Sequence, residues 1–220
     1  MSTTVPVYLE VGSKLTHAIV PAWPGWSRAG RDEASALQTL IDFAPRYAWA
    51  LRSQGIDLPA LSGIGDLDVV GRLKGNATSD FGVPGLTLPG DELPIDALDL
   101  ERFEAIVAAC WWAFDRAVAA ADGKALRVGP RGGGRSLEGV ISHVREVEAA
   151  YAGAMGVKLA AGADAASARA AIITGLRAVA SGEIPSTGPR GGKRWTPRYF
   201  IRRLAWHELY HAWVTEDRIL

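Results

Sequence analysis

The spacing of apolar residues changes near residue 96, and this change constrains the fold more than any other feature of the chain. From Asp96 onward apolar residues recur at intervals of three and four, which gives an α-helix one apolar face. The pattern predicts four helices, spanning about 99–121, 136–151, 164–180 and 196–214. Ser136 and Thr196 are suitable N-cap residues for two of them. Four amphipathic helices within 125 residues favour a four-helix bundle.

The first part of the chain has a different pattern. Short β-like runs at 7–11 and 16–20 are followed by turn signals, and a helical stretch from about 32 to 52 contains Pro45, which must kink or restart it. Residues 68–73 are compatible with another strand. The Gly- and Pro-rich residues 76–94 are typical of a loop or linker. We therefore expect an α+β fold, with a small α/β domain in residues 1–92 and the bundle in residues 93–220.

Charge and composition exclude several classes of protein. Lysine plus arginine and aspartate plus glutamate each number 24, so the chain lacks the net positive charge typical of proteins that bind nucleic acid or anionic membranes. No run of 18 apolar residues is present, and the N-terminus does not resemble a signal peptide. The single cysteine, Cys110, allows no intramolecular disulfide. We expect a cytoplasmic protein.

The segment before the bundle is expected to have an accessory role. Its helical stretch opens with Asp32 and Glu33, which disfavours a contact with phosphates. We expect residues 1–92 to bind neither DNA nor RNA. We expect them to pack on the bundle or to help form a homodimer, with three tryptophans as apolar anchors: Trp23, Trp26 and Trp49.

Histidines are the candidate functional residues. The chain has four, and His207 and His211 are one helical turn apart on the core-facing side of the last helix. Two buried imidazoles are costly unless their ring nitrogens have partners, and a metal ion supplies such a partner. Hydrogen bonds to neighbouring Tyr or Glu side chains are the alternative. His143 is the candidate third ligand, whereas His17 is interpreted as a strand or surface histidine.

The same segment also matches the H-E-x-x-H pattern of zinc peptidases, in which Glu208 would be the general base. Only nine residues follow His211, which leaves little chain for a downstream third ligand. Val214 and Asp217 stand where the longer metzincin pattern has glycine and histidine. The context disfavours a peptidase, and Glu208 is interpreted as a neighbour of the metal ligands or as an interfacial residue.

Two segments carry a resemblance to a known family. Residues 135–148 resemble the second helix of the DinB/YfiT-like bundles, and residues 203–211 resemble their last helix. This resemblance implies a metal held by His143, His207 and His211 with an open coordination position. Family members include thiol-dependent transferases and hydrolases, so the resemblance implies a divalent transition metal (Zn, Ni or Fe) and a small-molecule or thiol cosubstrate.

The expected function is therefore a metal-dependent enzyme, a hydrolase or thiol transferase, acting on a small molecule. A non-catalytic metal-binding or structural protein is the alternative, and a zinc peptidase is third. Residues 22–37 resemble the strand, turn and helix of HicB-like domains, which implies only a small α+β shape.

Two further groups of side chains are expected near the bundle site. Trp206 and Trp213 flank the histidine pair and are expected to wall a pocket. Five basic residues are expected to form a rim at the mouth of the bundle: Arg131, Arg135, Arg190, Lys193 and Arg194.

Overall fold

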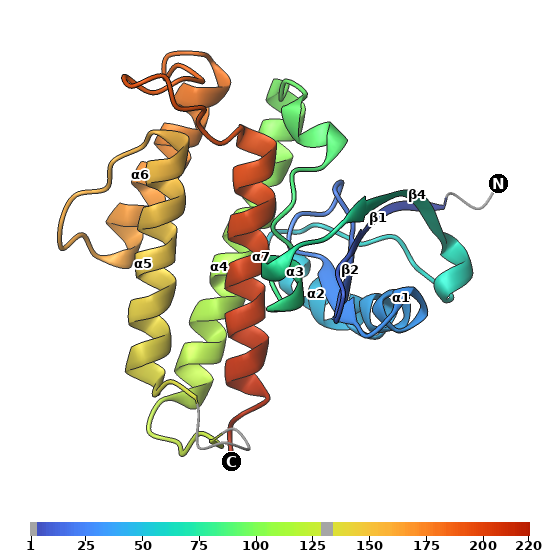
Figure 1. Ribbon diagram of the computed structural model, residues 1–220. Coiled ribbons are helices and arrows are strands. Elements are labelled where there is room, and N and C mark those ends of the chain that lie inside the picture. Colours follow the sequence, from blue (N-terminus) through green and yellow to red (C-terminus); the bar gives the residue numbers. More distant parts are fainter. Residues whose placement is uncertain (1–3, 129–133) are drawn as a thin grey trace.

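The computed structural model describes residues 4–128 and 134–220 and has a mixed α+β fold. A four-stranded sheet lies on one side of a set of long helices (Figure 1). The strands are β1 (Val5–Val11), β2 (Thr16–Ile19), β3 (Ser27–Gly30) and β4 (Leu67–Lys74). The helices are α1 (Glu33–Asp42), α2 (Ala44–Arg52), α3 (Ala77–Asp80), α4 (Ala97–Ala121), α5 (Leu137–Met155), α6 (Ala165–Ala180) and α7 (Pro197–Glu216). Short 3₁₀ turns occupy Ile64–Asp66 and Pro89–Glu92.

The sheet has the strand order β3-β2-β1-β4. β1 is antiparallel to β2 and parallel to β4, and β2 is antiparallel to β3. Parallel pairing needs a crossover connection, which α1 and α2 provide, and α1 packs against β2 and β3. Residues 27–30 were expected to belong to a turn-rich region, but they form β3. This short strand lacks the alternating apolar residues that reveal a strand in sequence, and its pairing with β2 determines its conformation.

Pro45 restarts the helix, as predicted. α1 ends at Asp42 and α2 begins at Ala44, so the proline occupies the first turn of α2, where its missing N–H costs no hydrogen bond. At the other end of α1, the Asp32 carboxylate accepts a hydrogen bond from the Ser35 backbone N–H at 2.7 Å. The Asp32 cap thus sets the start of α1, and Pro45 sets its end.

The four predicted helices of the second part are present. Each begins at a residue whose side chain accepts a backbone hydrogen bond: Asp96, Ser136, Asp164 and Thr196. The Asp96 cap starts α4 two residues earlier than the predicted start at Asp99. α4 and α7 pack against each other most extensively, and α5 lies beside α7 with α6 next to it (Figure 1). No helix among the described residues is long and apolar enough to cross a membrane.

Residues 76–94 are more than the predicted linker. The segment contains α3 and the turn Pro89–Glu92, and residues 84–91 bind along α7. Arg202 of α7 pairs with Asp91, and both side chains are buried. Arg203 donates a hydrogen bond to the Pro84 carbonyl at 2.5 Å, and the Tyr199 hydroxyl donates one to the Gly85 carbonyl at 2.7 Å. These bonds fasten the segment to α7, and we call residues 84–91 the α7 clamp.

The sheet layer also packs on the bundle through aromatic residues. The rings of Trp49 and Trp112 of α4 lie 4.5 Å apart between centroids. The Trp23 ring lies 4.2 Å from the guanidinium of Arg102, which also belongs to α4. Trp26 is different, because its indole N–H donates to the Leu40 carbonyl inside the N-terminal layer. Two of the three expected anchors therefore contact the bundle.

Candidate metal centre

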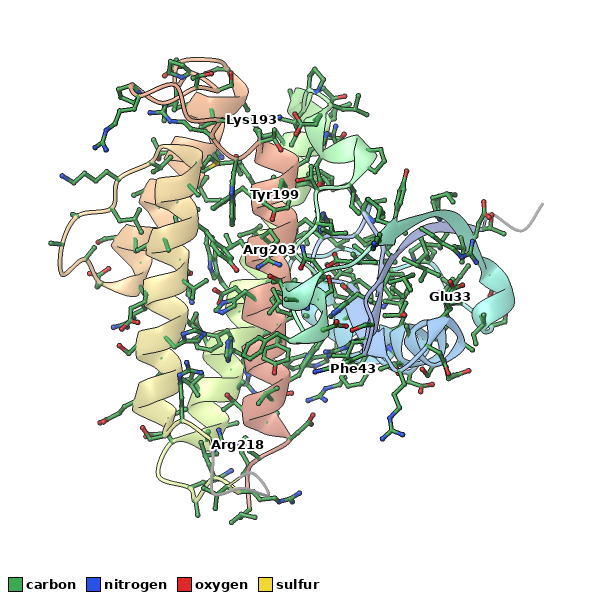
Figure 2. All side chains as sticks on the ribbon, viewed as in Figure 1. Glu33, Phe43, Lys193, Tyr199, Arg203 and Arg218 are labelled. Atoms are coloured by element: carbon green, nitrogen blue, oxygen red, sulfur yellow. The ribbon has the colours of Figure 1, made fainter. Side chains whose placement is uncertain are left out.

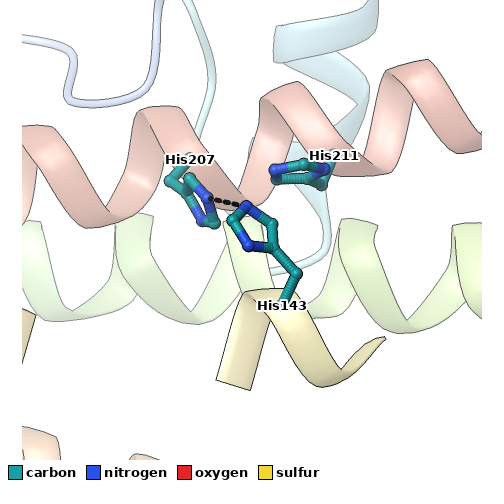
Figure 3. Close-up of side chains that lie close together, drawn as sticks. All are labelled: His143, His207 and His211. Atoms are coloured by element: carbon teal, nitrogen blue, oxygen red, sulfur yellow. Dashed lines mark hydrogen bonds between the residues drawn. The ribbon is translucent and has the colours of Figure 1, made fainter. Parts of the chain in front are cut away.

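Three imidazoles from two helices converge inside the bundle. His207 and His211 project from α7 toward His143 of α5 (Figure 3). One ring nitrogen from each histidine lies within 4.8 Å of the other two. The Nε2 atoms of His143 and His207 are 3.3 Å apart. The structure thus brings together the three residues that the sequence singled out as ligands.

Local structure explains the convergence. A separation of four residues places His207 and His211 on one face of α7, which packs against α5. On α5, buried Val140 and Val144 turn the flank that carries His143 toward α7. The site therefore depends on how α5 is rotated against α7.

The spacing of one nitrogen pair matches that of a tetrahedral metal site. Two nitrogens about 2.05 Å from a zinc-like ion, at a tetrahedral angle, lie roughly 3.3 Å apart. The Nε2 atoms of His143 and His207 are also 3.3 Å apart. Three imidazole nitrogens form a donor set suited to zinc, nickel or iron. The residues present therefore fit the group that the DinB-like resemblance implies.

Burial keeps these imidazoles neutral. The pKa of His207 is lowered to about 2, mainly by loss of solvation, with the neighbouring His211 and His143 as additional causes. Loss of solvation also lowers the pKa of His211 to about 4, with His143 and Arg135 as additional causes. The pKa of His143 is lowered by the same effect and by Arg135. The neutral imidazole is the form that binds a metal, so binding near pH 7 needs no loss of charge from these rings.

Hydrogen bonds within the described residues leave part of the histidine cluster without partners. A bond between the Nε2 atoms of His143 and His207 uses one ring nitrogen of each. The buried Nδ1 of His207 has no hydrogen-bond partner among the described residues. No Tyr or Glu side chain in residues 4–128 and 134–220 donates to or accepts from these imidazoles, so the alternative based on such partners lacks support.

Aromatic residues surround the cluster. The Tyr151 ring lies 6.0 Å and the Trp206 ring 6.3 Å from the His207 ring, and the Tyr210 ring lies 5.1 Å from that of His211. Arg203 donates a hydrogen bond to the Tyr151 hydroxyl at 2.7 Å. The sequence did not single out Tyr151 or Arg203. Tyr151 lies at the end of the predicted helix 136–151, and this position was its only signal in the sequence.

The two tryptophans expected to wall a pocket have different positions. Trp206 adjoins His207, as expected. Trp213 instead packs against Phe43 of the N-terminal layer, with ring centroids 5.5 Å apart, and against the guanidinium of Arg28. Trp213 lies two turns further along α7 on nearly the same face, and at that height Phe43 and Arg28 of the N-terminal layer cover it.

Glu208 lies in a separate buried cluster. Its side chain is fully buried, and neither carboxylate oxygen has a hydrogen-bond partner among the described residues. Burial raises its pKa well above the usual range, and the charge of Glu148 raises it further. Glu148 accepts a hydrogen bond from the Trp111 indole at 2.7 Å and lies 3.9 Å from Arg169 Nε. Within the described residues, Glu208 therefore makes no hydrogen bond to a candidate ligand.

The Glu148 cluster was not foreseen, although the sequence contained a signal for it. Glu148 follows buried Val144 by four residues and therefore lies on the apolar stripe of α5. A carboxylate at such a position requires a buried partner, and Trp111 and Arg169 take that role. The identity of the partners is decided by α4 and α6.

His17 lies outside the candidate metal centre. It occupies β2, as the strand interpretation required, but it is only 1% exposed, so the surface alternative is wrong. Its Nε2 lies 3.0 Å from the Ser79 carbonyl. Neighbouring strands and α3 bury the His17 side chain. This burial depends on residues far away in the chain, so the sequence around His17 does not predict it.

The expected basic rim is not one surface. Lys193 and Arg218 mark opposite ends of the bundle (Figure 2). Arg194 lies with Lys193, where it donates to the Pro185 carbonyl, whereas Arg135 lies near the candidate metal centre at the start of α5. Arg131 is outside the described residues. The loops separate residues that the sequence grouped by charge alone.

Comparisons of the chain with family models, with curated proteins and with solved structures gave no match.

Proposed function

We propose that this protein is a metal-dependent enzyme that acts on a small molecule, as a hydrolase or a thiol transferase. The observation that carries the proposal is the convergence of three neutral imidazoles whose ligand nitrogens lie within 4.8 Å of one another. The proposal includes the DinB-like assignment of residues 96–220, the HicB-like shape of residues 1–92 and a cytoplasmic location.

Three protein ligands favour an active site over a structural one. Structural zinc sites are usually closed by four protein ligands, whereas catalytic sites keep a position for water or substrate. Among the described residues, the group contains three candidate ligands and no fourth. A divalent ion held there would lower the pKa of a bound water or thiol toward neutrality. The non-catalytic alternative therefore has less support.

Side chains around the three histidines hold neighbouring groups of the site in position. Tyr151, Trp206 and Tyr210 border the imidazoles with aromatic rings and limit the access of water. Arg203 is fixed at both ends of its guanidinium, by the Pro84 carbonyl and by the Tyr151 hydroxyl, and so holds the Tyr151 ring in place. In this arrangement Tyr151 and Arg203 are positioning residues.

The peptidase alternative is disfavoured by Glu208. A general base must reach the proton that it removes, directly or through one water. The Glu208 carboxylate is fully buried, and its charged neighbours are Glu148 and Arg169 instead of the histidines. The H-E-x-x-H match therefore places its glutamate inside the bundle.

Metal analysis of purified variants tests the proposal. The wild-type protein should retain about one ion per chain after dialysis, and His211→Ala should lose it together with activity in a screen of esters and thiol cosubstrates. Glu208→Gln is the matched control on the same turn of α7, and it should keep the metal and most of the activity. Wild-type protein without metal would refute the proposal. Casein hydrolysis that disappears in Glu208→Gln would favour the peptidase instead.

A further inference from the structure

A hollow of about 480 Å³ lies beside the candidate metal centre, with His211 in its wall. Its size is typical of a small-molecule site. Part of the lining is apolar: Val128, Val140, Tyr210 and Val214. The hollow thus provides a place for an apolar molecule next to a candidate ligand.

The remaining lining is rich in positive charge. Three arginines line the hollow, Arg127, Arg135 and Arg218, and the only acidic residue in the described lining is Asp217. Asp217 is already paired with Arg46, at 2.9 Å. The hollow therefore has an excess of positive charge, although the chain as a whole is neutral.

Two of these arginines have guanidinium groups available for a ligand. Arg218 donates to the carbonyls of Arg127 and Arg135, which fixes its position between them. The side chains of Arg127 and Arg135 make neither an ion pair nor a hydrogen bond to any part of the chain that the structure describes, and both residues are exposed. A planar guanidinium matches the two oxygens of a carboxylate or phosphate.

Arg135 also lies close to the imidazoles. Its positive charge contributes to the lowered pKa of all three: His143, His207 and His211. It precedes Ser136, the N-cap of α5, whose first backbone N–H groups add a partial positive charge at the same place. An anion between Arg135 and His211 would therefore lie next to the proposed reaction centre.

We propose that this hollow binds the oxyanion end of a small substrate, a carboxylate or phosphate group on an apolar body, between Arg135 and the face of His211. The inference rests on the proposed function, because it assigns a substrate class to the same site. Arg135 binds the oxyanion, Arg127 and Arg218 maintain the positive charge, and the valines and Tyr210 contact the apolar body.

The experiment measures binding of two probes, benzoate and inorganic phosphate, to the full-length protein by calorimetry at low ionic strength. Both the metal-loaded and the metal-free protein are titrated, because an ion in the site can itself attract an anion. Arg135→Gln should weaken binding about tenfold or more with unchanged metal content. Arg190→Gln is the matched control, since Arg190 is an exposed arginine in the loop at the other end of the bundle, and it should change nothing.

Each outcome is informative. Saturable binding of benzoate, of phosphate or of both that is weakened by Arg135→Gln supports the inference, and the preferred probe identifies the oxyanion. Absence of saturable binding by both probes, or equal affinities in wild-type protein and Arg135→Gln, overturns it. Failure of the proposed function has a different signature, because the protein then lacks metal whether or not the metal-free form binds a probe.

Discussion

Burial sets the protonation state of the histidines at the scale of single residues. His17 and His207 lie in different layers, yet loss of solvation is the main cause of the lowered pKa in both. At His207 the neutral ring provides a candidate ligand. At His17 the neutral ring donates to the Ser79 carbonyl and joins β2 to α3. One physical effect thus supports a candidate site in one layer and a structural hydrogen bond in the other.

His17→Gln should make folding less sensitive to acid. The folded-state pKa of His17 is lowered, so below about pH 6.5 the unfolded chain takes up a proton that the folded chain does not. Stability is therefore lost as pH falls from about 6.5 toward the folded-state value. Glutamine retains an N–H donor without a titrating group. Urea unfolding at pH 7.5 and 5.5 should show a loss smaller by up to about 1 kcal/mol in the variant; equal losses would contradict this assignment.

The α7 clamp links the N-terminal layer to the helix that carries His207 and His211. Its residues hold α7 from the side of the sheet, while α4 and α5 hold the same helix from within the bundle. Asp91, at the end of the clamp, pairs with Arg202 of α7, and both side chains are almost completely buried. Breaking a buried pair by removing one partner leaves an uncompensated charge, which is costly.

Asp91→Ala should destabilise the protein by roughly 3–5 kcal/mol, because it leaves Arg202 buried without its partner. The next residue supplies a matched control. Glu92 pairs with Lys193 at 2.8 Å, but both side chains are largely exposed, so Glu92→Ala should cost at most about 1 kcal/mol. Chemical denaturation of both variants measures the difference. Similar losses would show that the clamp contributes little.

At the scale of the whole molecule, the core is continuous from the sheet to the bundle. Buried residues of β1, α2, α4, α5, α6 and α7 belong to one apolar cluster. Such a core stabilises the fold independently of a metal, unlike that of a zinc finger. A bound ion should therefore add stability through binding without determining the fold.

Removal of the metal by a chelator should lower the melting temperature and leave the helical circular dichroism at 25 °C unchanged. With free metal at about 100 times its Kd, binding contributes about 2.7 kcal/mol, which corresponds to roughly 5–10 °C for a chain of this size. His211→Ala should not respond to the chelator. Loss of the helical signal in the wild-type protein would show that the metal is required for folding.

Local features of this protein could be predicted from neighbouring residues alone. The spacing of apolar residues predicted α4, α5, α6 and α7, and Ser136 and Thr196 were recognised as the caps of α5 and α7, whereas the Asp96 cap of α4 was not. The four-residue spacing of His207 and His211 fixed their common face. These features depend on the backbone geometry of one segment, so neighbouring residues contain the necessary information.

Contacts between segments far apart in the chain arise from the packing of the folded protein. This packing brought His143 to 3.3 Å from His207, 64 residues away, enclosed Glu208 with Glu148, and turned residues 84–91 from a linker into a clamp. Such contacts depend on the rotation and offset of packed helices, and these are determined by the shape of the entire core. A local pattern specifies the face of a helix, whereas the packing of the whole chain specifies what that face contacts.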